Sequence, residues 1–290
     1  MLADRRQVLL TTLAALAAGT PGLAKASKTD STRIVVRRHR LFVPAQINGH
    51  PVLALLDSAA ELTLLDRAFA RRLGLLAGVD LKAKGSGAQK VAAQLVENVV
   101  MTAPGMIRHI GPAAVIDLTD VSRRLNGAPI AVILGRDYFD QVRLEIDIDA
   151  QCLRPLDPGE QARGHLFPLK TEFGVETLTV SAEGQIAQAT VDLGNGSDLL
   201  ISPAFAARIG ALGDGREIGE VRGGGLGGEA VRRRFMLKSL AIGEKTFMYI
   251  PVVVDIGESA TDLNLGTSIL RHFTLTTDFA NHRLWLLSKR

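Results

Sequence analysis

Two aspartates stand at matching points in the two halves of this 290-residue chain. Asp57 follows the apolar run 54–56, and Asp192 follows the similar run 189–191. Small residues are frequent after each of them. Paired carboxyl groups are suited to acid–base chemistry, because one can take up a proton while the other donates one. The two aspartates are therefore the first candidates for a reactive site.

Further landmarks follow each aspartate in the same order. Each half has an Arg-Leu-Gly or Arg-Ile-Gly sequence, then an apolar-Leu-Gly sequence, then a second aspartate. Their distances from Asp57 and Asp192 agree within four residues. The paired landmarks are Gly74 and Gly210, Gly135 and Gly266, and Asp147 and Asp278. Four landmarks in one order, counting the first aspartates, indicate two copies of one fold.

The elements that position the two aspartates are predicted to be β-hairpins. Turns at residues 48–49 (Asn-Gly) and 183–184 (Glu-Gly) each precede the strand that leads into an aspartate. Asn and Gly tolerate the positive φ angles of a tight hairpin turn. Short apolar strands continue through both halves, with glycine-rich turns at 85–87 and 223–228. Many short strands and few helices predict an all-β protein.

One short helix is predicted in each half. Asp66 caps the first, which Gly74 ends; Ser202 caps the second, which Pro203 begins and Gly210 ends. A linker rich in Pro and Gly at 156–160 separates the halves. The expected domains are therefore 34–156 and 165–290.

Composition argues for a globular protein without a nucleic-acid partner. Apolar residues make up 47% of the chain and charged residues 22%, which suits a protein with a sizeable core. The net charge is +4, and one Trp and two Tyr leave little for base stacking. The basic clusters 37–40 and 232–234 are expected to be solvated surfaces. The single Cys152 excludes an intramolecular disulfide, and the six histidines show no metal-ligand spacing.

The N-terminal residues 1–26 are typical of an export signal. Arg5 and Arg6 precede the apolar run 8–18, and residues 24–26 (Ala-Lys-Ala) fit a cleavage site. The adjacent arginines resemble a twin-arginine signal, with an ordinary secretory signal as the alternative. Cleavage would remove three positive charges and one negative charge, which leaves +2. We expect a periplasmic or secreted protein without a stable membrane anchor, because the apolar run is too short to span a bilayer.

The order of these features resembles the retropepsin-like aspartic proteases. That family has a strand, a hairpin, an Asp-Ser/Thr-Gly loop, a short helix ending in Leu-Gly, a glycine-rich flap hairpin, an apolar-Leu-Gly sequence and a strand ending in aspartate. Two copies resemble a bacterial tandem form with a pepsin-like bilobal outline. The resemblance covers roughly residues 38–156 and 165–288. It implies two tandem β-barrel lobes, each with a short helix, on either side of a central cleft.

The resemblance also implies an aspartic endopeptidase that uses no cofactor and no metal. Asp57 and Asp192 would form a catalytic dyad that activates water against a peptide or protein substrate, in a chain that acts as a monomer. Gly135 and Gly266 would support the two loops from behind. The implied active-site loop residues are Ser58, Ala59, Ala60, Leu193, Gly194 and Asn195. The implied flap residues are Gly85, Ser86, Gly87, Gly223, Gly224 and Gly225.

Each loop departs from the family sequence at a different position. Ala59 stands where the family has glycine, and Leu193 stands where it has a hydroxyl side chain. An added methyl group can change the local backbone, and a missing hydroxyl removes half of the hydrogen bonding that joins the loops in the family. A second hypothesis is therefore a pseudoprotease that binds extended peptides without cutting them.

Simpler interpretations of the same residues stay open. Asp57 can be a helix N-cap, and residues 58–61 also fit a capping box with Ser58 as the cap. Asp192 can be a turn residue, because Gly and Asn follow it. Asp147 and Asp278 are expected at strand ends, and Tyr138 is expected in the core. A phosphate loop at 223–228 is disfavoured, because no Lys-Ser/Thr follows.

Overall fold

The computed structural model describes residues 31–289, apart from residues 77, 84, 86, 88, 173 and 256–260. The predicted export signal at 1–26 lies outside the described residues. Strands dominate the described chain, and they form two sheets of eight strands and one of six. No helix within this part of the chain is both long and apolar enough to cross a membrane.

The first eight-stranded sheet, here called the first lobe, carries Asp57. Its strands in spatial order are β2 (Val35–Arg37), β3 (Arg40–Ile47), β4 (His50–Leu56), β9 (Val132–Leu134), β5 (Leu64–Asp66), β8 (Met106–Ile116), β7 (Val91–Ala103) and β6 (Val79–Ala83). A further pairing of β3 with β7 curls the sheet back on itself. Asp57 directly follows β4, so this strand sets its position.

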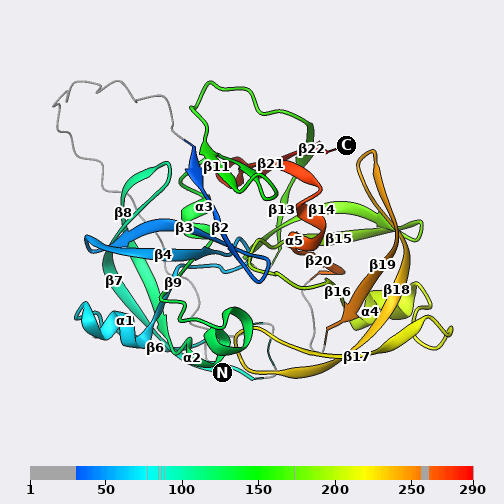
Figure 1. Ribbon diagram of the computed structural model, residues 1–290, viewed down its shortest axis with the longest axis horizontal. Coiled ribbons are helices and arrows are strands. Elements are labelled where there is room, and N and C mark those ends of the chain that lie inside the picture. Colours follow the sequence, from blue (N-terminus) through cyan, green and yellow to red (C-terminus); the bar gives the residue numbers. More distant parts are fainter. Residues whose placement is uncertain are drawn as a thin grey trace, which may run out of the picture.

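The second eight-stranded sheet, here called the second lobe, repeats that order strand by strand. Its strands are β13 (Lys170–Glu172), β14 (Val175–Ala182), β15 (Gln185–Val191), β20 (Leu263–Leu265), β16 (Leu199–Ile201), β19 (Lys245–Val254), β18 (Ala230–Ile242) and β17 (Glu217–Gly223). The extra pairing of β14 with β18 matches that of β3 with β7. The all-β class predicted from the short strands, and the two barrel-like lobes implied by the family resemblance, are therefore observed. Figure 1 shows the lobes on the left and right.

A third sheet joins the lobes along one side of the molecule. Its strands are β1 (Thr32–Arg33), β11 (Cys152–Pro155), β10 (Leu144–Asp147), β21 (Phe273–Asp278), β22 (Arg283–Ser288) and β12 (His165–Pro168). The antiparallel pair β10–β21 lies at its centre, with Leu144 opposite Thr277 and Asp147 opposite Thr274. Each half of the chain thus contributes one strand of this pair, seen between the lobes at the top of Figure 1.

The hairpin turns have the geometry that their sequences predict. Asn48 and Gly49 have φ angles of 48° and 78°, and Glu183 and Gly184 have 51° and 78°. Positive φ at both central residues matches the right-handed twist of the flanking strands. These turns connect β3 to β4 and β14 to β15, and so fix the register of the strands that end at the aspartates.

The two predicted helices are present with their predicted caps. Asp66 accepts hydrogen bonds from two backbone N–H groups at the start of α1 (Arg67–Arg72), and Ser202 accepts one at the start of α4 (Pro203–Arg208). The expectation of one helix for each half was incomplete. The described residues contain four more short helices: α2 (Thr119–Val121), the π-helix η1 (Ser122–Asn126), α3 (Arg136–Phe139) and α5 (Thr267–Leu270), besides the 3-10 turn η2 (Phe279–Asn281). α2 continues directly into η1, and all of these helices are too short for local propensity to favour them strongly.

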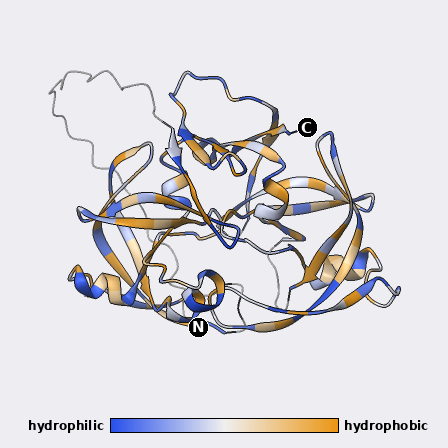
Figure 2. Cartoon of the chain, viewed as in Figure 1, coloured by the Kyte–Doolittle hydropathy of each residue, from blue (hydrophilic) through white to orange (hydrophobic). Residues whose placement is uncertain are grey.

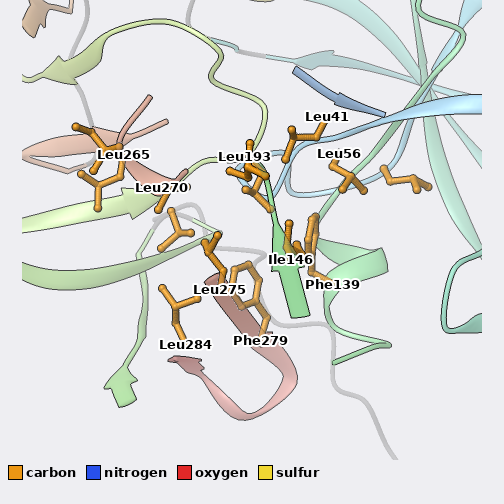
Figure 3. Close-up of a cluster of buried hydrophobic side chains, with 14 of the residues drawn as sticks. Leu41, Leu56, Phe139, Ile146, Leu193, Leu265, Leu270, Leu275, Phe279 and Leu284 are labelled. Carbon is orange, nitrogen blue, oxygen red and sulfur yellow. The ribbon is translucent and has the colours of Figure 1, made fainter. Parts of the chain in front are cut away.

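The larger of two apolar clusters among the described residues runs through both lobes and the joining sheet, and the smaller lies in the first half of the chain. Hydrophobic and hydrophilic residues are interleaved along the strands in Figure 2, so each sheet turns one face inward. Figure 3 shows part of the main cluster, with Leu193 of the second lobe in the same group as Leu41 and Leu56 of the first. The labelled members from the joining sheet are Ile146, Leu275 and Leu284. The lobes therefore share a core.

The expectation that both basic clusters form solvated surfaces is wrong for two residues. Arg40 and Arg232 are each only 6% exposed. Arg232 donates to Asp255 over 3.0 Å, and Arg40 donates to the backbone oxygens of Arg38 and Leu125. Sequence patterns give only the density of charge, whereas the strand alternation that turns Arg40 and Arg232 inward is a property of the sheet.

Candidate active site

The two aspartate loops are attached to their lobes in the same way. The backbone N–H of Asp57 donates to the oxygen of Leu134 over 3.0 Å, and that of Asp192 donates to the oxygen of Leu265, also over 3.0 Å. Leu134 ends β9 and Leu265 ends β20, and these strands lie parallel to β4 and β15. Equivalent strands thus hold the two aspartates at equivalent positions in their lobes.

Each aspartate side chain is oriented by its own loop. Oδ1 of Asp57 accepts hydrogen bonds from the backbone N–H groups of Ala59 and Ala60, both at 3.1 Å. Oδ1 of Asp192 accepts from those of Gly194 and Asn195, both at 2.9 Å. Neither aspartate caps one of the described helices, so the interpretation of Asp57 as a helix N-cap, or of Ser58 as the cap of a capping box, is wrong. Both carboxyl groups are partly buried.

The two loops contact each other across the lobes. A Cβ atom built on Gly194 would lie 2.4 Å from Cγ of Asp57 and 2.5 Å from its Oδ2. Such distances are shorter than any van der Waals contact. The Asp57 carboxyl group therefore occupies the space that a side chain at position 194 would need. The residue two positions after Asp192 is therefore in direct contact with the other aspartate.

Ser58 and Leu193 join the loops asymmetrically. The Ser58 hydroxyl donates to the backbone oxygen of Val191 over 2.7 Å and accepts from the N–H of Leu193 at 3.0 Å. Leu193 has no hydroxyl to return these bonds, and its side chain is fully buried in the shared core instead. The residue after the aspartate is thus a hydroxyl residue, Ser58, in the first loop and an apolar residue, Leu193, in the second.

The loops are supported from behind by the two glycines. A Cβ on Gly135 would lie 2.5 Å from the carbonyl carbon of Leu62, and one on Gly266 would lie 2.5 Å from the backbone oxygen of Asn195. The following residues bond the same loops: Arg136 N–H donates to the oxygen of Ala60, and Thr267 N–H donates to that of Asn195. Only glycine permits this close approach.

The glycine-rich turns of the two lobes lie against each other. The N–H of Gly87 donates to the oxygen of Leu226 over 2.8 Å, and that of Gln89 donates to the oxygen of Gly227 over 2.9 Å. A Cβ on Gly85 would also strike Leu226. Gly223 ends β17, and Gly224 and Gly225 begin the turn to β18. Ser86, which the sequence placed in the first flap, lies outside the described residues.

Arg124 holds the second of these turns from the opposite lobe. Its guanidinium group donates to the oxygen of Gly224 over 2.7 Å and to that of Gly225 over 2.9 Å. Asp120, one turn earlier, pairs with the same guanidinium at 2.7 Å. The sequence contained no indication of this link, because it joins residues 100 positions apart.

Two functional candidates were missed by the sequence. Asn264 donates from Nδ2 to Oδ2 of Asp192 over 2.7 Å. The sequence signal that could have identified Asn264 is a polar residue inside an apolar strand, two residues before Gly266. Arg40 is the second: both aspartates act electrostatically on this buried guanidinium, and its Nε has no hydrogen-bond partner among the described residues.

The pKa values of both aspartates are raised. Burial and the neighbouring charge of Asp192 raise the pKa of Asp57 to about 7, against the opposing effects of backbone hydrogen bonds and Arg40. Burial also raises the pKa of Asp192, and the hydrogen bond from Asn264 opposes this increase. Two carboxyl groups that resist joint ionisation can hold a single proton between them, which suits acid–base catalysis.

The remaining predicted residues lie away from these loops or in their supports. Asp147 and Asp278 end β10 and β21, where they pair with Lys289 and Arg143. Tyr138 is 1% exposed, and its hydroxyl donates to the oxygen of Pro104. In the ranges that the structure describes, no three His, Cys, Asp or Glu side chains form a group able to hold a metal ion.

A known protein family matches part of the first half of the chain. Residues 43–138 match the family model described as aspartyl protease. This stretch is about a third of the chain and contains Asp57 and the supporting Gly135. The match supports the aspartyl protease family.

Curated relatives point in the same direction. Protein DDI1 homolog 2 of Danio rerio is 28% identical over 127 residues, which are 42% of this chain and 28% of that protein. Protein DDI1 homolog 1 of Rattus norvegicus is 34% identical over 134 residues, 44% of this chain and 29% of that protein. UBA domain-containing protein Mud1 of Schizosaccharomyces pombe is 30% identical over 122 residues, 40% and 33% of the two chains. The chain thus spans a third or less of these relatives.

Proposed function

We propose that this protein is an aspartic endopeptidase in which Asp57 and Asp192 together activate a water molecule. The observation that carries the proposal is the contact between the two loops, in which the Asp57 carboxyl group lies against Gly194 two residues after Asp192. Two equivalent strands lead into the two loops, and the raised pKa of each aspartate supports a state in which the pair holds one proton. That state supplies a base and an acid at once.

The chemistry requires no covalent intermediate. The ionised carboxylate takes a proton from water as the water oxygen bonds to the peptide carbonyl carbon, while the protonated carboxyl group donates a hydrogen bond to the carbonyl oxygen. The tetrahedral intermediate then loses its amine, which leaves with a proton from the carboxyl groups, and the C–N bond breaks. The carboxyl group that took the proton from water gives it to the departing nitrogen and is ionised again, while the other carboxyl group keeps its proton, so the pair is ready for the next water.

The substrate is proposed to lie as an extended strand between the aspartate loops and the glycine-rich turns. Turns of glycine and small residues leave backbone N–H and C=O groups accessible, and an added strand is recognised mainly through such groups. The contacts of Gly87 with Leu226 and of Gln89 with Gly227 would open when the peptide enters. The supporting evidence is the placement of these turns, one from each lobe.

Peptide cleavage over a range of pH tests the proposal. A diverse peptide mixture is incubated with the protein from about pH 3 to 8, and products are identified by mass spectrometry. Asp57→Asn and Asp192→Asn are each expected to abolish cleavage while the fold is retained. Asp157→Asn, which changes an exposed aspartate in the linker, is the matched control and is expected to cleave normally. Cleavage that survives either dyad substitution would refute the mechanism.

A second candidate function is peptide binding without cleavage. Ala59 and Leu193 favour it, because neither loop has the full family sequence. A folded protein that binds extended peptides but cuts none of them at any pH would establish this alternative. Binding would then be nearly indifferent to Asp57→Asn.

We further propose that the protein is exported and acts outside the cytoplasm as a monomer. The support is the pair Arg5 and Arg6, the apolar run 8–18 and the small residues at 24 and 26. Expression followed by cell fractionation is expected to yield a chain that begins at Ser27. Replacing both arginines by lysine is expected to block a twin-arginine route and to spare an ordinary secretory one. Sedimentation of the product measures its oligomeric state.

A further inference from the structure

The two aspartates have matching backbone bonds but unequal side-chain partners. Ile133 lies opposite Leu55, two residues before Asp57, and Asn264 lies opposite Thr190, two residues before Asp192. The two positions are therefore equivalent in the register of the lobes. Ile133 is a buried apolar residue, whereas Asn264 donates to Oδ2 of Asp192 over 2.7 Å. Within the described chain, no side chain donates to Oδ2 of Asp57.

The amide of Asn264 is held so that its nitrogen faces Asp192. Its oxygen accepts a 2.9 Å hydrogen bond from Nδ2 of Asn195, which leaves only the NH₂ group to meet the carboxyl group. The residue equivalent to Asn195 in the first lobe is Ala60, which has no polar side chain. Within the part of the chain that the structure describes, the relay of hydrogen bonds from Asn195 to Asn264 to Asp192 has no counterpart in the first lobe.

We propose that Asn264 gives the two aspartates different tasks, so that Asp192 carries the negative charge and takes the proton from water, while Asp57 keeps its proton and binds the substrate carbonyl. This inference rests on the proposed function. Asn264 is a positioning residue, because it acts through Asp192. The physical reason is that a fixed N–H donor binds an ionised oxygen more strongly than a neutral one.

The other charged groups near the two aspartates do not determine which of them is ionised. Arg40 acts on both carboxyl groups, and repulsion between two like charges does not by itself select which of them is ionised. Burial raises the pKa of both, but only for Asp192 does a side-chain hydrogen bond oppose the increase. Among the side-chain hydrogen bonds that the structure describes, the one from Asn264 therefore distinguishes the two aspartates.

The first experiment compares the pH dependence of kcat/KM in two leucine variants. Asn264→Leu removes the donor with little change in size, and Ile133→Leu makes the same residue at the equivalent position of the first lobe. Asn264→Leu is expected to move the acidic limb of the profile to higher pH and to lower kcat/KM on that limb about tenfold, since a hydrogen bond to a charged group is lost. Ile133→Leu is expected to leave both limbs in place. Equal profiles for Asn264→Leu and the unaltered protein would overturn the inference.

A second measurement needs no activity. The carboxyl carbons of ¹³C-labelled aspartate are titrated by NMR, with Asp57→Asn and Asp192→Asn used to assign the signals. Asp192 is expected to ionise at lower pH than Asp57, and Asn264→Leu is expected to reduce the difference. If Asn264→Leu does not fold, Asn195→Ala removes the group that holds the amide and is expected to act in the same direction. Two aspartates that titrate alike would overturn the inference, whereas absence of cleavage alone would count against the proposed function only.

Discussion

Ser58 of the first lobe is bonded at both sides of its hydroxyl group to the backbone around Leu193 of the second. It donates to the oxygen of Val191 over 2.7 Å and accepts from the N–H of Leu193 at 3.0 Å. The Leu193 side chain in turn lies in the core that both lobes share. The two lobes are thus joined at the aspartate loops by one buried hydroxyl and one apolar side chain.

Replacing Ser58 is expected to loosen this junction. Ser58→Ala leaves the Leu193 N–H and the Val191 oxygen buried without partners, which costs about 1–3 kcal/mol of unfolding free energy. The matched control is Ser268→Ala, since the buried hydroxyl of Ser268 has no hydrogen-bond partner within the described chain. Denaturant unfolding measures both. Equal stability of the two variants would show that the Ser58 bonds are unimportant.

A methyl group at Gly194 is expected to impair catalysis more than folding. Its Cβ would strike the carboxyl group of Asp57, which must shift. A displacement near 1 Å can lower the rate about a hundredfold, so kcat is expected to fall by at least that factor in Gly194→Ala. Ala59→Gly, at the equivalent position of the first loop, removes a methyl group and is expected to keep full activity. A fully active Gly194→Ala protein would contradict the proposed role of the Asp57 carboxyl group.

The pH dependence of stability follows from the raised pKa of Asp57. Its folded-state pKa is about 7 and its ordinary value is 3.8, so the folded protein holds a proton that the unfolded chain releases between these values. The contribution of the protonated Asp57 to the free energy of unfolding is full below about pH 3.8, and it is lost as pH rises to about 7. Asp57→Asn avoids this loss.

Relative to the unaltered protein, Asp57→Asn is therefore expected to gain stability with rising pH. The gain between pH 4 and pH 8 should be on the order of 1–4 kcal/mol. Thermal unfolding across that range measures it, with the exposed Asp157→Asn as the control that should follow the unaltered protein. A pH-independent difference would argue against a buried proton at Asp57.

A buried ion pair between the lobes is expected to contribute to their docking. Arg136 of α3 lies 2.5 Å from Glu176 of β14, whose side chain is fully buried. Among the described residues, Arg136→Ala leaves that carboxylate with Thr171 and His282 as its polar side-chain partners, and loss of one member of a buried pair costs about 3–5 kcal/mol. Arg123→Ala, in an exposed pair with Asp120, should change stability little. Similar unfolding midpoints for both variants would contradict this expectation.

Features that depend on neighbours in sequence were predictable. The hairpin turns at Asn48 and Glu183 and the caps at Asp66 and Ser202 arise from local backbone preferences. The doubled landmarks predicted two similar lobes, and the lobes have the same strand order. The inward orientation of Arg40 was not predictable, because it depends on which face of β3 meets the rest of the protein.

The sequence by itself determined the two aspartates, the strands that lead to them and the glycines that allow close approach, since each reflects the conformational preference of a short segment. The tertiary structure alone decided that Asp57 lies against Gly194, that Ser58 bonds to Leu193, and that Asn264 reaches Asp192. These contacts join residues 72 to 137 positions apart. Their geometry depends on the docking of whole sheets around a shared core, and no short segment of the chain contains that information.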